Sequence, residues 1–247
     1  MPGAERYGFL RPDPPPGSVP GLTGAVQLCL SYVRELVPLD TQLGHWPKKS
    51  VIDALQPFLF DARGIARGET VHAIIDAAKL DDLPDHLAQS DLRHRCLFKG
   101  DALRDWGHVA PWLVTLGPDD RLTRRLFTGG ERPFGWWDSG AALFMRGDSD
   151  LDALWRHLRK YTRIEDEGGR WAYFRFWEAV AIQMLYRSRA LPHARDFFAP
   201  CAAWLAPMPK DHACLVIEQR CDPHPAALPV PLRPALPEPE PATEDAR

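Results

Sequence analysis

Two polar side chains lie in a short apolar run that could carry chemistry at the end of a strand. The run VHAIIDAA, residues 71–78, contains His72 near its start and Asp76 toward its end. Because α/β proteins often place active carboxylates at strand ends, one hypothesis is a small-molecule enzyme that uses Asp76 and His72. The preferred interpretation is structural: Asp76 caps the turn or helix that follows, and His72 is a buried imidazole with satisfied hydrogen bonds.

Cysteine and histidine side chains near the end of the chain could bind a metal ion. They are Cys201, His212, Cys214, Cys221 and His224, in the pattern C-x10-H-x-C-x6-C-x2-H. A zinc site normally contains a closely spaced C-x2-C pair, which this pattern lacks, and Cys214 lies in the apolar run ACLVI. We therefore expect no metal site and no cofactor. The five cysteines are interpreted mostly as packing residues in a reducing compartment.

The common catalytic and phosphate-binding motifs are missing from the sequence. There is no G-x-S-x-G, G-x-G-x-x-G, Walker A loop, H-E-x-x-H or C-x-x-C pattern. None of the nine histidines falls in a tight sequence cluster with carboxylates. We therefore predict no catalytic residues and a protein that is not an enzyme.

The stretch GRWAYFRFWEA, residues 169–179, has five aromatic residues within positions 171–177. In a strand, successive side chains point to opposite faces. One face would carry Trp171, Tyr173, Arg175 and Trp177, and the other would carry Ala172, Phe174 and Phe176. We expect the second face to lie in the core. The first face is too apolar to be left bare, so we expect the following helix to cover it, with contact to a partner as the alternative.

Aromatic residues beside arginines could also stack nucleic-acid bases, which gives residues 171–177 a further alternative function. A general nucleic-acid binder should be basic, but this chain has a net charge of −3 and a pI near 6.3. The stretch also continues into a predicted helix that begins with Glu178, and no second aromatic motif lies on another strand. We therefore expect no nucleic-acid partner.

The elements that must position these residues alternate between helices and strands. Helices are predicted at residues 24–37, 50–56, 82–90, 119–130, 149–162, 178–188 and 191–200. Strands are predicted at residues 71–78, 95–100, 110–117 and 212–219, with a strand pair or one long broken strand at 134–147 and a hairpin turn at 166–169. This order predicts an α/β (mixed α+β) fold: a mixed sheet with a β-hairpin, helices packed on it and a small helical C-terminal portion. A Rossmann fold is disfavoured because no glycine fingerprint follows the first strand.

Proline-rich ends bound the predicted globular part. Residues 1–21 are predicted to be a flexible lead-in, residues 22–220 one α/β domain, and residues 221–247 an acidic, disordered tail. The start MPGAERYGFL lacks the basic residues and apolar run of a secretory signal. No stretch approaches the roughly 18 apolar residues that span a bilayer. We therefore expect a cytoplasmic protein without a membrane partner.

A series of motifs along the chain resembles one known family. The series is VHAIIDAAK, LFKGD, APWLVTL, LDALWRHLRKYTRIEDEGGRWAYFRFW and FFAP. It is similar to the adaptor-chaperone family of bacterial type VI secretion, the Tap/TEC adaptors, formerly a domain of unknown function. The resemblance covers about residues 50–205. Asp76 lies on the family's opening motif, and the aromatic motif is matched by Arg170, Phe174, Arg175, Phe176 and Trp177.

The resemblance implies a function by binding. In the cytosol, such an adaptor binds the N-terminal region of a toxic effector. It then loads the effector onto the VgrG spike protein and needs no cofactor. Two departures concern the aromatic motif, whose Y-D-P end is here Trp177-Glu178-Ala179, and the following region, which is shorter than in adaptors with a large helical second lobe. Because family members handle different effectors, the resemblance assigns no partner-binding residues.

Overall fold

The strand β2 (Thr70–Asp76) is buried on both sides from Val71 to Asp76, which explains why four of its seven residues are apolar and why its buried His72 and Asp76 need hydrogen-bond partners. In this computed structural model, which describes residues 27–130, 134–165, 168–219 and 228–229, β2 lies inside a large sheet. Val71, Ala73 and Ile75 pack into one apolar cluster, while Ile74 packs into a second cluster on the opposite face. The strand predicted at residues 71–78 is therefore confirmed.

The large sheet has the strand order β10-β1-β9-β8-β5-β2-β4-β3. Its other strands are β1 (Leu28–Val33), β3 (His94–Cys96), β4 (Pro111–Leu116), β5 (Ala142–Gly147), β8 (Ala203–Met208), β9 (Ala213–Gln219) and β10 (Leu228–Pro229). The mixed α+β class is confirmed. All pairings between these described strands are antiparallel, so the sheet is antiparallel rather than mixed in strand direction.

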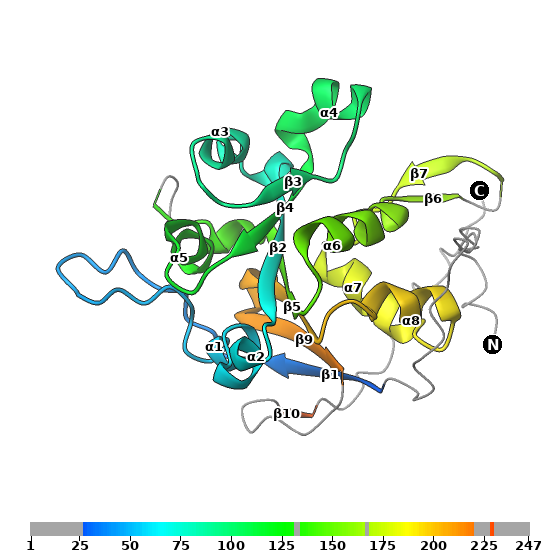
Figure 1. Cartoon of the computed structure of the whole chain (residues 1–247). Coiled ribbons are helices and arrows are strands. Elements are labelled where there is room, and N and C mark those ends of the chain that lie inside the picture. Colours follow the sequence, from blue (N-terminus) through cyan, green and yellow to red (C-terminus); the bar gives the residue numbers. More distant parts are fainter. Residues whose placement is uncertain (1–26, 131–133, 166–167, 220–227, 230–247) are drawn as a thin grey trace, which may run out of the picture.

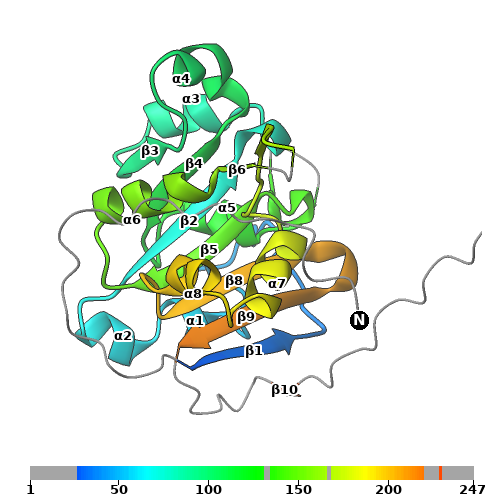
Figure 2. The same ribbon diagram turned by 90° about the vertical axis from the view of Figure 1, so that its right-hand side faces the viewer.

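Helices cover both faces of the sheet (Figure 1). One face packs against α1 (Gln56–Leu59), α3 (Leu83–Ala88) and α5 (Arg121–Phe127), and α2 (Ala62–Ala66) lies beside α1 in Figure 1. The opposite face packs against α6 (Leu151–Leu158), α7 (Ala179–Arg187) and α8 (Pro192–Phe198), which lie in front of the sheet in Figure 2. The short helix α4 (Asp101–Trp106) lies beyond β3 at one end of the sheet. This arrangement encloses two separate apolar clusters.

The helix predicted at residues 24–37 is wrong, because residues 28–33 form the strand β1. Six of its residues pair with β9 from Leu28 to Val33, and the sheet supplies the backbone hydrogen bonds that a helix would have formed internally. A short apolar run fits either period, and tertiary pairing decides between them. The helix predicted at residues 50–56 is also displaced: α1 has Pro57 in its first turn, where proline is well tolerated, rather than after its end.

The predicted helical C-terminal portion corresponds to α7 and α8, but the chain then returns to the sheet as β8 and β9. Strand β8 was absent from the sequence-based prediction. The buried face of α7 is Ala181, Ile182 and Leu185. Val180 and Met184 of the same helix are exposed.

Cys96, Cys201 and Cys214 are free and buried, as expected for packing residues, whereas Cys29 is disulfide-bonded. The remaining cysteine, Cys221, lies outside the described residues, as do the lead-in at 1–21 and almost all of the tail at 221–247. Among the described residues, no helix has the length and apolar character needed to cross a membrane.

Candidate functional site

Asp76 ends the strand β2 and has no exposed surface. One carboxylate oxygen accepts a hydrogen bond from the backbone N–H of Ala78 at 3.1 Å, so the side chain caps the 3-10 turn Ala77–Lys79, in agreement with the preferred interpretation. Its other oxygen accepts a hydrogen bond from the guanidinium of Arg175. Asp76 thereby joins the interior of the sheet to a segment 99 residues later in the chain.

Arg175 lies between two carboxylates. Besides its contact with Asp76, its Nε–H donates to the carboxylate of Glu178 at 2.8 Å. Burial alone would lower the pKa of Arg175, but the hydrogen bonds and negative charges of Glu178 and Asp76 outweigh it and raise the pKa. Glu178 stands where the related motif has Asp, so this chain retains a carboxylate there. The three side chains form what we call the Arg175 clamp.

The segment held by the Arg175 clamp begins with a hairpin of β6 (Arg163–Glu165) and β7 (Trp171–Tyr173). The predicted hairpin is confirmed, although Asp166 and Glu167 of its turn lie outside the described residues. The two strands form a sheet of their own. All three residues of β7 are exposed; the exposed fractions of Trp171 and Tyr173 are 63% and 51%. The sequence predicted that the following helix covers the strand face that carries Trp171 and Tyr173, and this prediction is wrong for these two residues.

The second half of the aromatic run is buried. Phe176 has no exposed surface, Trp177 is nearly enclosed, and Phe174 packs against the same apolar cluster as both. The period-two alternation fails after Tyr173 because the strand ends there and the chain turns, with the backbone N–H of Glu178 donating to the carbonyl of Arg175. Trp177 is therefore unavailable for base stacking. Arg170, also on the related motif, is exposed at the hairpin turn.

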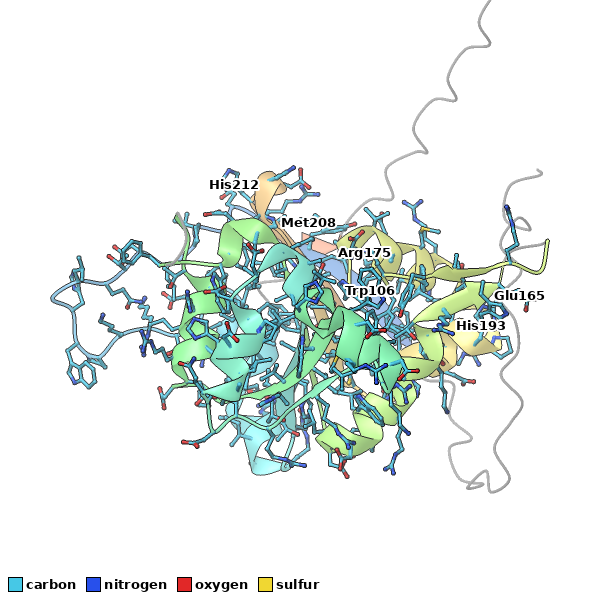
Figure 3. All side chains as sticks on the ribbon, turned by 90° about the horizontal axis from the view of Figure 1, so that it is seen from above. Trp106, Glu165, Arg175, His193, Met208 and His212 are labelled. Atoms are coloured by element: carbon cyan, nitrogen blue, oxygen red, sulfur yellow. The ribbon has the colours of Figure 1, made fainter. Side chains whose placement is uncertain are left out.

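The exposed aromatics are attached to the body of the protein. The ring of Tyr173 packs against Phe98, with centroids 5.1 Å apart, and the guanidinium of Arg163 lies 5.8 Å from the Tyr173 ring centroid. Seen from above, Arg175 lies near the middle of the molecule and Glu165 lies toward its edge (Figure 3). The hairpin thus runs outward from the Arg175 clamp, and presents Trp171 and Tyr173 on a fixed base. We call these two residues the hairpin aromatics.

The structure does not bring His72 and Asp76 together as a catalytic pair. They are four positions apart on β2, or roughly 13 Å along a strand. One ring nitrogen of His72, Nε2, donates to the carbonyl of Ser149 at 3.1 Å, and Nδ1 accepts from the Thr115 hydroxyl at 3.2 Å. This assignment requires a neutral ring. Both side chains already have structural partners, as the preferred interpretation predicted.

Burial lowers the pKa of His72, against a smaller opposing effect of its hydrogen bond to Ser149. Because the unfolded chain binds this proton more readily, stability from neutral His72 is present above pH 6.5 and is lost as the pH falls toward the folded-state pKa. We expect the urea concentration at the midpoint of unfolding to decrease as the pH is lowered below 6.5. The variant His72→Gln should show a weaker dependence of this midpoint on pH. An unchanged pH dependence in His72→Gln would contradict this assignment.

The residues considered for a metal site do not assemble within the described part of the chain. Cys201 and Cys214 are enclosed in the core, where burial raises the pKa of both thiols. His212 lies in the turn before β9, while Cys221 and His224 lie outside the described residues. No group of three or more potential metal ligands occurs among the described residues. The expectation of no metal and no cofactor stays a prediction.

Comparison with known proteins identifies the family. Residues 71–196, slightly more than half of the chain, match the family described as a domain of unknown function, DUF4123. No curated protein and no solved structure matches the chain. The matched region begins in β2 and ends in α8, so it includes Asp76, the hairpin and the Arg175 clamp. The chain belongs to the DUF4123 family.

Proposed function

We propose that this protein is a cytosolic adaptor that binds a type VI secretion effector and helps to load it onto the VgrG spike. The DUF4123 family is associated with such adaptors, which supports the proposal. The proposed partners are the N-terminal region of the effector and VgrG. No catalytic activity is proposed, because the polar residues of β2 are engaged in structural hydrogen bonds.

The observation that carries the proposal is the exposure of the hairpin aromatics on a fixed base. Tryptophan and tyrosine are the residues most often found at the energetic centre of protein interfaces, since they bury a large area at a small cost in side-chain entropy. The Arg175 clamp and the contact of Tyr173 with Phe98 hold the hairpin in place before binding. A preorganised surface loses less conformational entropy when a partner binds.

The double substitution Trp171→Ser and Tyr173→Ser is expected to weaken effector binding by at least about tenfold, because truncating a hot-spot aromatic typically costs about 2 kcal/mol or more. The measurement is co-purification of the full-length chain with a type VI effector and VgrG from the same gene cluster, followed by titration. Nuclease treatment before capture separates protein binding from the nucleic-acid alternative.

A matched control is Trp46→Ser. Trp46 is 88% exposed in the loop between β1 and α1, which projects from the side of the molecule opposite the hairpin in Figure 1. This variant should bind the effector like the wild type. Equal retention by the hairpin variant and the Trp46 control would show that the hairpin aromatics are not the docking surface. Failure of the wild-type chain to retain either partner would contradict the adaptor function itself.

A further inference from the structure

A hollow of about 400 Å³ lies where the start of β1 meets the turn between α7 and α8. Its wall is formed by Gln27, Leu28, Arg187, Arg189, Ala190 and Arg195. Three of these six residues are arginines, so three positive charges surround one small volume. Guanidinium groups bind carboxylates with paired, parallel hydrogen bonds, so the chemistry of the wall suits a carboxylate-bearing ligand.

Two of the three arginines have hydrogen-bonding capacity to spare. Arg189 donates to the carbonyl of Tyr186 at 3.1 Å, and its guanidinium lies 4.1 Å from the Tyr186 ring centroid. Arg187 and Arg195 are exposed, and their guanidinium groups form no hydrogen bond or ion pair within the part of the chain that the structure describes. Like charges gathered without a counter-charge repel one another, and a bound anion would relieve this repulsion.

We propose that the hollow is a carboxylate-binding site and that its occupant is the acidic end of this same chain, residues 238–245. This segment, EPEPATED, carries four carboxylates at Glu238, Glu240, Glu244 and Asp245. It lies outside the described residues. The complementary charge of the segment and of the wall is the first argument for this occupant, and the position of the chain before it is the second.

The last described residues of the chain lie beside β1. Leu228 is paired with Tyr32 and Pro229 with Ser31 in an antiparallel register, so the chain direction at Pro229 points toward Leu28 in the wall of the hollow. Ser31 and Leu28 are three positions apart, or roughly 10 Å along a strand. Glu238 follows Pro229 by nine positions, which an extended chain spans over as much as roughly 30 Å. The length of chain between Pro229 and Glu238 therefore exceeds the distance along β1 to Leu28 in the wall of the hollow.

The test uses the full chain and a fluorescein-labelled peptide of residues 234–247, PALPEPEPATEDAR, followed by fluorescence anisotropy at low salt. In the wild type the chain's own terminus competes with the peptide. In the variant E238Q/E240Q/E244Q/D245N this competition is removed, so the peptide should bind at least about tenfold more tightly. Adding R187S and R195S to that variant should abolish the gain, and raised salt should weaken the binding.

The matched control adds R104S and R156S to the same tail variant, which removes the same charge from exposed arginines outside the hollow. This control should bind the peptide as the tail variant does, and circular dichroism should be alike for all variants. Equal binding of the peptide by the wild type and the tail variant would overturn the proposal. An equal loss of peptide affinity in the R187S/R195S and R104S/R156S variants would overturn it as well. Displacement by inorganic phosphate as effective as displacement by unlabelled peptide would also overturn it.

Discussion

Replacing Asp76 by alanine is expected to lower the free energy of unfolding by about 2–4 kcal/mol. The substitution leaves the N–H of Ala78 without its acceptor and removes a carboxylate from Arg175 at a site where Asp76 has no exposed surface. Breaking such a pair on one side costs more than the pair itself contributes, because the half-buried Arg175 then keeps only Glu178 as a carboxylate partner. Urea unfolding followed by tryptophan fluorescence measures the change.

Two further variants separate the effects of charge and hydrogen bonding. Asp76→Asn keeps an oxygen acceptor for Ala78 but loses the negative charge, so a smaller loss of about 1–2 kcal/mol is expected. Asp53→Ala, which removes an exposed partner of Lys49, should change stability by less than about 0.5 kcal/mol. An Asp76→Asn variant as stable as the wild type that had lost a measurable turnover would instead support the enzyme hypothesis.

Phe176→Ala is expected to destabilise the protein by about 3–5 kcal/mol, the usual cost of deleting a fully buried phenylalanine ring. Its ring packs edge-on against Trp177 and Phe197, with centroids 5.3 Å away in each case, so a cavity would open beneath α8. The cavity cannot be filled by collapse without moving that helix. Thermal and urea unfolding of the purified variant measure the loss.

Trp171→Ala is the matched comparison, because it removes a larger aromatic ring from the same run of residues. Since Trp171 is mostly exposed, the expected change in stability is less than about 0.5 kcal/mol. The two variants together test whether the run is divided at the end of β7 into an exposed part and a core part. Similar losses in both variants would contradict this division.

Local sequence patterns were sufficient for several elements. The short apolar run at 71–78 predicted β2, and the segment at 119–130, with acids first and arginines later, predicted α5. The glycine-containing turn near Gly169 predicted the hairpin. In each case the signal lies within a few consecutive residues, since backbone preference and hydrophobic period are local properties. The order of such motifs also carried the resemblance to the family.

The site required the tertiary structure. Asp76 and Arg175 were each singled out by the sequence, but on separate motifs, and only folding brings them into contact across 99 positions. Burial within the aromatic run also depended on the tertiary structure. Strand alternation placed Trp171 and Trp177 on one face, but the chain turns after Tyr173, so Trp171 is exposed and Trp177 is buried. For β1, pairing with β9 overrode a helical pattern. Contacts, exposure and strand pairing depend on what the rest of the chain packs against each residue, and no local pattern contains that information.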